Sequence, residues 1–199
     1  MLFRSDRRSL TVSQRDPVEG RGLTWTQRLR LSAWTGTTAY PVELSLTGQD
    51  TVVSLPTPPD LVLLGTDGLG YGRLGLDSAS RRWLLDRLEA LPEPIERAVA
   101  WDALWEDLID GTIPAESFLA TAARVLRREP DDLLTSRILG LTESAFWRFL
   151  RPAARIELAP SLERVLWDEM GRATTVSRKA AFFNTLTSVT LTPAGVARL

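Results

Sequence analysis

A literal G-x-G-x-x-G pattern, GYGRLG at residues 70–75, is the part of this sequence that most closely matches a chemical motif. An apolar run, LVLL, lies upstream at 61–64, and a helical pattern opens downstream at Ser78. Strand, glycine loop and helix in this order form the turn that binds a dinucleotide. Such a turn also needs a second parallel strand, and its third glycine lies inside the helix. Because only helical patterns follow Ser78, we interpret 70–76 as a final sandwich strand that leads into the first helix, with glycines at a bend.

Histidine and cysteine are both absent from the 199 residues. Their absence excludes Ser-His-Asp and Cys-His catalysis, histidine or thiolate metal sites, and disulfides. Lys179 is the only lysine, so the basic side chains are almost all arginine. We therefore assign no catalytic, cofactor-binding or metal-binding residue and expect no cofactor in this chain.

Two groups of acidic residues could in principle bind a cation or transfer protons. REPDDLL (128–134) contains Glu129, Asp131 and Asp132, and WEDLID (105–110) contains Glu106, Asp107 and Asp110. The first group lacks the alternating ligands and central glycine of a calcium loop, and acids in a first helical turn are favoured by the helix dipole. The second group is more simply a solvated helix face. We interpret both groups as structural.

Seven tryptophans offer surfaces for ligand stacking, and Trp25 with Trp34 could form a platform for a sugar or a peptide. Trp101 and Trp105, however, share one helical stripe with leucines. The remaining tryptophans, which also have apolar neighbours in the sequence, are Trp83, Trp147 and Trp167. Packing in a core or a domain contact is the simpler interpretation.

Composition and charge predict no nucleic-acid or membrane partner. The net charge is −1, and FWRFLRPAAR (146–155) is more simply an amphipathic helix than a basic-aromatic patch. The apolar share of 44% and the charged share of 25% are typical of a globular protein. The opening residues MLFRSDRRSL lack the apolar region of a signal peptide, so we expect a cytoplasmic location.

The first part of the chain, 1–76, has apolar residues with a period of two. Three alternating runs carry this pattern: SLTVSQ (9–14), LTWTQRLRLSAW (23–34) and VELSL (42–46). Clusters of Gly, Pro, Asp and Thr separate them. Short strands at these intervals predict a small antiparallel sandwich.

After Asp77 the period changes to 3.6. We predict helices at 78–91, 94–110, 114–128, 131–140, 143–151, 161–171 and 175–188, with a last helix opening at 193. The expected N-caps are Ser78, Thr142, Ser161 and Thr192, and the expected first-turn prolines are Pro94, Pro130 and Pro193. Helix ends are expected at Gly111, Gly140 and Gly171.

These patterns predict an α+β protein in two segregated parts. A small antiparallel β-sandwich domain would occupy 1–76, and an irregular, HEAT-like array of helical hairpins would occupy 77–199. The chain stops about two turns after a helix opens at Pro193, so we expect it to be a fragment and the helical domain to be truncated.

The order of these segments resembles a known family. PDLVLLGTDGLGYGRLGLD (59–77) resembles the junction between sandwich and helices in zinc aminopeptidases of the aminopeptidase N type, which are gluzincins. ERAVAWDALWEDLIDGTIPAESFL (96–119) and SRKAAFFNTLTSVTLTPAGVARL (177–199) are similar to later helical segments. Relatives usually carry Asn near position 65 or 66, where this sequence has Gly65 and Thr66. The resemblance covers nearly the whole chain.

The resemblance implies a non-catalytic role. In such enzymes, zinc is bound by H-E-x-x-H and a downstream Glu, and none of these ligands is present here. The family implies that the sandwich is a spacer and that the helices frame a chamber that admits peptide ends. The expected partners are the catalytic domain of the same parent polypeptide, where zinc would be bound, and the peptide substrates of that parent.

Two other functions remain open at this point. The chain could be a free-standing interaction module whose helical array binds a protein or a peptide. A hydrolase that uses only carboxylates is the weaker possibility.

Overall fold

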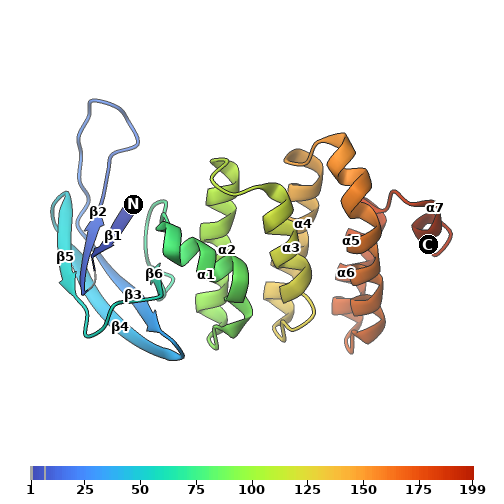
Figure 1. Ribbon diagram of the computed structural model, residues 1–199, viewed down its shortest axis with the longest axis horizontal. Coiled ribbons are helices and arrows are strands. Elements are labelled where there is room, and N and C mark those ends of the chain that lie inside the picture. Colours follow the sequence, from blue (N-terminus) through green and yellow to red (C-terminus); the bar gives the residue numbers. More distant parts are fainter. Residues whose placement is uncertain (1, 7) are drawn as a thin grey trace. The chain divides into compact units, whose positions relative to one another are not determined.

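The computed structural model describes residues 2–6 and 8–199. The chain forms two compact units, Met1–Asp110 and Gly111–Leu199. The first unit contains the strands and the first two α-helices, and the second contains the remaining helices (Figure 1). The predicted α+β class, with a small antiparallel sandwich followed by helical hairpins, is confirmed. The predicted domain boundary between 76 and 77 stays a prediction.

Two three-stranded antiparallel sheets form the sandwich. One sheet has the order β1 (Leu2–Asp6), β2 (Ser9–Ser13), β5 (Asp50–Ser54). The other has the order β4 (Thr38–Leu46), β3 (Gln27–Thr35), β6 (Leu61–Leu64). In the second sheet Leu31 lies opposite Val42 on one side and opposite Leu64 on the other, so the apolar positions of three strands come into register.

The period of two in the sequence produces the sandwich core. Leu10 and Val12 of β2 are buried against Leu29 and Leu31 of β3 and Leu44 of β4. Alternate residues of each strand point to the same face of a sheet, so this one cluster unites the inner faces of both sheets. The strand predictions at 9–14 and 42–46 are confirmed: β2 ends one residue earlier, at Ser13, and β4 begins four residues earlier, at Thr38.

The strand predicted at 23–34 begins later, at Gln27. The side chain of Gln14 explains the difference, because its amide pairs with both main-chain groups of Trp25. Gln14 Oε1 accepts from the Trp25 N–H at 3.0 Å, and Gln14 Nε2 donates to the Trp25 carbonyl at 3.1 Å. These bonds replace strand-to-strand pairing at Trp25, which lies in the loop before β3.

The final strand predicted at 70–76 is wrong, because this segment is irregular. The Tyr71 N–H donates to the side-chain oxygen of Gln27 at 3.0 Å instead of pairing with a strand. Arg73 binds Glu106 and Asp110 at the end of the helix α2 (Pro94–Ile109). Gly65, with φ of 74°, lies directly beneath the Leu74 side chain, where a Cβ would be 2.5 Å from Leu74 Cδ1. Side-chain contacts rather than sheet pairing therefore fix this segment.

Helices α1 (Ser78–Arg87) and α2 contact β6 in the first unit. A short 3-10 turn, η1 (Leu88–Ala90), connects them. Asp77, and not Ser78 as predicted, caps α1 by accepting from the Ser80 N–H at 2.6 Å. A half-buried ion pair from Arg81 Nε to Asp107 Oδ2 at 2.7 Å ties α1 to α2.

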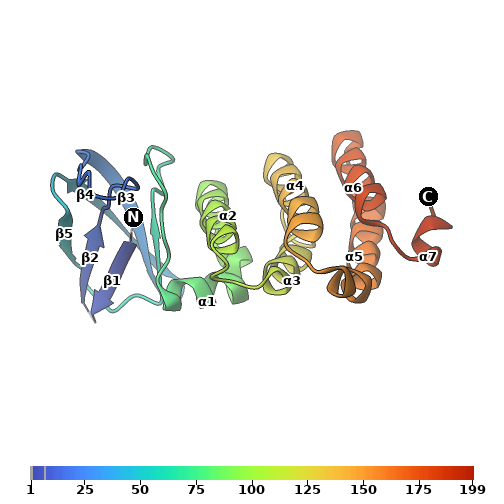
Figure 2. The same cartoon turned by 90° about the horizontal axis from the view of Figure 1, so that it is seen from above.

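The second unit consists of two helical hairpins and a short final helix (Figure 2). Its helices are α3 (Ala115–Val125), α4 (Asp132–Arg148), α5 (Pro152–Arg172), α6 (Val176–Val189) and α7 (Pro193–Val196). Helix α3 packs on α4, α5 packs on α6, and α4 packs on α6. No helix in residues 2–6 and 8–199 combines the length and apolar character needed to span a lipid bilayer.

Two helix boundaries were predicted wrongly. The helices predicted at 131–140 and 143–151 are one helix, α4, because Gly140 stays helical and the buried Thr142 hydroxyl donates to the Ile138 carbonyl at 2.8 Å. Helix α5 begins at Pro152 and not at Ser161, and it contains Pro160. The Ser161 hydroxyl donates to the Leu158 carbonyl at 2.9 Å within this helix. In both cases tertiary packing maintains the helix through residues that often end one.

The other predicted helix signals have mixed outcomes. Pro94 and Pro193 lie in first turns as predicted, and Thr192 caps α7. Pro130 precedes the cap residue Asp131, so it lies outside α4. Gly111 follows the end of α2 with φ of 69°, as expected for a C-terminal glycine. Gly171, by contrast, lies within the last turn of α5.

A buried carboxylate fixes the end of the second unit. Glu163 of α5 accepts hydrogen bonds from the N–H groups of Leu191 and Thr192 at 2.8 and 3.0 Å and from the Thr192 hydroxyl. The Thr192 hydroxyl oxygen in turn accepts from the Gly195 N–H at 2.9 Å. Glu163 therefore pairs the main-chain donors that precede α7.

We expect Glu163→Gln to lower the free energy of unfolding by about 1–3 kcal/mol, because the amide oxygen can serve only the Leu191 and Thr192 N–H groups, while the amide nitrogen replaces Oε2, the acceptor of the Thr192 hydroxyl. Urea unfolding followed by circular dichroism measures this change. Glu157→Gln is the matched control, since Glu157 is exposed on the same helix. Equal stabilities of the two variants would contradict the role given to Glu163.

Candidate functional site

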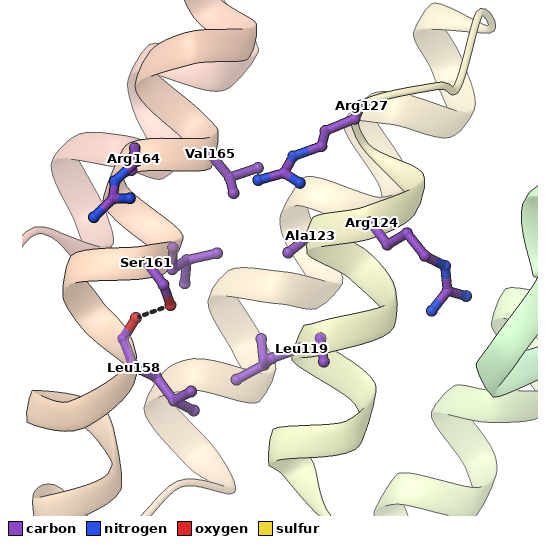
Figure 3. A pocket seen from close by; sticks show the side chains of 10 residues that line it. Leu119, Ala123, Arg124, Arg127, Leu158, Ser161, Arg164 and Val165 are labelled. Carbon is purple, nitrogen blue, oxygen red and sulfur yellow. Dashed lines mark hydrogen bonds between the residues drawn. The ribbon is translucent and has the colours of Figure 1, made fainter.

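The α3–α5 groove is a cavity of about 290 Å³ in the second unit (Figure 3). We define it by its lining residues. The apolar ones are Leu119, Ala120, Ala123, Leu158, Leu162 and Val165, and the polar ones are Arg124, Arg127, Ser161 and Arg164. Every lining residue comes from α3, from the turn after it, or from α5.

The helix packing produces this groove. Helix α4 packs directly on α6, whereas the groove separates the facing sides of α3 and α5. Ala120 and Ala123 project no side chain beyond Cβ, so the α3 wall leaves space that a larger residue would fill. Leu119 and Leu162 are buried and form an apolar floor. The groove can therefore accept an apolar side chain from outside.

Arginine supplies all the charge of the groove. Among the described residues that line it there is no aspartate or glutamate. The Arg127 side chain reaches from the α3 side toward Val165 of α5, whereas the Arg124 guanidinium points away from α5 (Figure 3). The Arg127 and Arg164 side chains are both exposed. An anionic group at the Arg127 end of the groove would therefore be favoured.

A second candidate surface lies in the first unit, on the loop between β2 and β3. Asp16 organises this loop by accepting from Arg21 Nε at 2.6 Å, from Arg21 Nη2 at 2.8 Å and from the N–H groups of Val18 and Leu23, each at 3.0 Å. The hydrogen bond from Arg21 holds the pKa of the Asp16 carboxyl well below its usual range. Together with the Gln14 bonds to Trp25, these contacts give a long loop a defined conformation.

This loop presents an aromatic side chain next to the glycine-rich segment. Trp25 is 37% exposed and Tyr71 is 81% exposed, and both line a cavity of about 690 Å³. The Arg21 guanidinium carbon lies 5.9 Å from the centre of the Trp25 ring. Trp34 is only 6% exposed and belongs to β3, so Trp25 and Trp34 do not form the platform that was the alternative to core packing.

The acidic residues singled out in the sequence stabilise helices. Asp107 pairs with Arg81, and the helix cap Asp131 accepts from the Leu134 N–H at 2.8 Å. Asp132 binds Arg178 at 2.9 Å, which lowers the pKa of its carboxyl. Within the part of the chain that the structure describes, no three acidic residues converge as metal ligands. The contacts of Asp107, Asp131 and Asp132 give these three acids structural uses.

The basic-aromatic segment at 146–155 has a structural use as well. Arg155 Nε donates to the Phe146 carbonyl at 3.1 Å, and Arg155 Nη2 donates to the Trp147 carbonyl at 2.8 Å. Its guanidinium carbon also lies 5.2 Å from the centre of the Trp147 ring. Arg155 therefore binds main-chain acceptors at the end of α4, where the helix dipole favours a cation.

One buried carboxyl was missed by sequence reasoning. Glu96 lies in the first turn of α2, where a sequence shows only an acid suited to the helix dipole, but the structure buries it near Ser32 and Trp34 of β3. Burial raises the pKa of the Glu96 carboxyl, and the nearby negative charge of Glu93 raises it further. The side chains of Ser32 and Trp34 act in the opposite direction. Within the described residues, Glu96 Oε2 has no hydrogen-bond partner.

We expect Glu96→Gln to raise the free energy of unfolding at pH 7–8 by about 1 kcal/mol. A raised pKa in the folded state means that Glu96 contributes most stability below its unfolded pKa of about 4.5 and loses this contribution as pH rises through its folded pKa. The advantage of the variant should therefore shrink toward pH 4. Urea unfolding at several pH values measures it, with Asp86→Asn, an exposed site on α1, as control. A constant difference across this pH range would contradict the assignment.

Comparison with known proteins gives one partial similarity. No protein-family model matches the sequence. The chain is similar to Aminopeptidase N from Streptomyces lividans, with 26% identity over 117 residues. This match covers 57% of the present chain and 14% of the length of that protein. A loose relationship to an aminopeptidase is therefore supported.

Proposed function

We propose that this chain is a non-catalytic C-terminal region of a zinc aminopeptidase. The observation that carries the proposal is the similarity to Aminopeptidase N, which covers 57% of the chain. The order of the segments, with a sandwich followed by helical hairpins, fits the region after the catalytic domain in the family that the sequence resembles. A sequence without histidine cannot supply H-E-x-x-H, so zinc and the activated water would belong to the catalytic part of the parent protein.

In this proposal the two units have supporting roles. The sandwich of the first unit acts as a spacer, and its core consists of apolar side chains. The hairpins of the second unit frame the space through which peptides reach the active site of the parent. The parent would hydrolyse the bond after the N-terminal residue of a peptide. The acidic and aromatic candidates in the present chain serve helix capping and packing, which is consistent with a supporting role.

We expect the purified chain to show no turnover of aminoacyl-anilides, either with added zinc or after chelation, because it has no imidazole or thiolate to hold a catalytic metal. Release of the anilide chromophore measures turnover, and metal analysis after dialysis measures bound zinc. A zinc-loaded catalytic aminopeptidase serves as the positive control. Zinc-dependent turnover by this chain alone would overturn the proposal.

The coding sequence on either side of the chain tests the proposal directly. An upstream frame that encodes H-E-x-x-H and a later Glu is the expected result. A native start codon at Met1 and a native stop codon after Leu199 would instead favour a free-standing interaction module. The α3–α5 groove is the observation that favours this second function, because it offers a partner an apolar floor edged with arginine.

A further inference from the structure

The chemistry of the α3–α5 groove specifies a ligand more closely than either function above requires. The apolar floor contains Leu119 and Leu162, and the groove volume of about 290 Å³ suits one or two apolar side chains rather than a large cofactor. A purely apolar ligand would make no use of the Arg127 guanidinium, which reaches across the groove. A partner for this groove should therefore combine an apolar group with negative charge.

The charges around the groove are of one sign. Arg127 extends over the groove toward Val165, whereas the Arg164 guanidinium lies on the side of α5 away from α3 (Figure 3). Because the described lining residues include no acid, an incoming carboxylate would meet no repulsion from the groove itself. In the described part of the chain, the lining of the cavity beside Trp25 also includes no acid, but two of its three arginines are already paired, Arg21 with Asp16 and Arg73 with Glu106.

We propose that the α3–α5 groove binds an acidic peptide segment. One apolar side chain of the peptide, such as leucine, rests on Leu119 and Leu162, and a neighbouring glutamate or aspartate carboxylate binds the guanidinium group of Arg127. Arginine favours such carboxylates because its planar guanidinium donates two parallel hydrogen bonds. The proposal does not rest on the aminopeptidase assignment, since it is argued only from the side chains that line the groove.

Fluorescence anisotropy with an end-capped, labelled peptide SGEELEEGS tests this proposal. We expect saturable binding to the full chain that weakens about threefold when salt is raised from about 50 to 300 mM, because exposed ion pairs are screened. A peptide with glutamine in place of every glutamate, and one with serine in place of leucine, should each bind more weakly.

The variant Arg127→Gln should weaken binding of the acidic peptide about fivefold, because one charge-assisted contact is lost. The Arg127 side chain is exposed, so the fold should be retained, which circular dichroism checks. Arg148→Gln is the matched control, since it removes the same charge from an exposed position on α4 outside the groove.

Three results would overturn the proposal: no binding of the acidic peptide, equal binding of the glutamine peptide, or equal weakening by the Arg148 variant. Tight binding of the glutamine peptide only when its C-terminus is free would show that the groove takes a terminal carboxylate instead. Failure of any of these tests would leave the coding-sequence test of the aminopeptidase proposal unaffected.

Discussion

The burial of all four residues of β6 is the constraint on which the first unit depends. Val62 and Leu64 belong to the core between the two sheets, and Leu61 and Leu63 are buried as well. A strand can be buried on both faces only when another layer covers its outer face. Helices α1 and α2 contact β6 and supply that layer. The first unit is therefore a sandwich with helices on one sheet.

This covering layer determines the environments of several polar groups. The N–H of Val62 donates to the Ser80 hydroxyl at 2.9 Å, so the start of α1 is bonded to β6. Glu96 becomes buried because α2 lies against the same sheet. Arg73 binds the far end of α2 and thereby orders the glycine-rich segment. A segment that looks like a nucleotide-binding loop thus has its conformation set by apolar packing and ion pairs.

In the second unit, the helices of the two hairpins are unequally spaced, and this spacing produces the groove. The contact between α4 and α6 holds the two hairpins together, while the α3–α5 groove stays open on the other side. The hairpins are also tied at one end, where Arg178 of α6 binds Asp132 and the Glu129 carbonyl. An acid that the sequence offered as a metal ligand therefore links two hairpins. The groove, and not the acidic cluster, is the feature suited to binding.

The sequence by itself determined the fold class, the change from a period of two to a period of 3.6, and most helix positions. These follow from local patterns: alternating apolar residues in strands, apolar stripes in helices, and residues such as Thr192 that cap their own helix. The absence of histidine and cysteine also restricted the possible chemistry without any structure.

Only the tertiary structure decided which of several local signals prevailed. Gly140 and Pro160 stay within helices because packing of the whole helix outweighs a local preference to stop. The burial of Glu96 and Glu163, and the approach of Arg127 to Val165 of α5 at one groove, depend on residues far apart in the chain. The spacing of residues along the sequence does not predict these contacts, because they arise from how separate elements pack against one another.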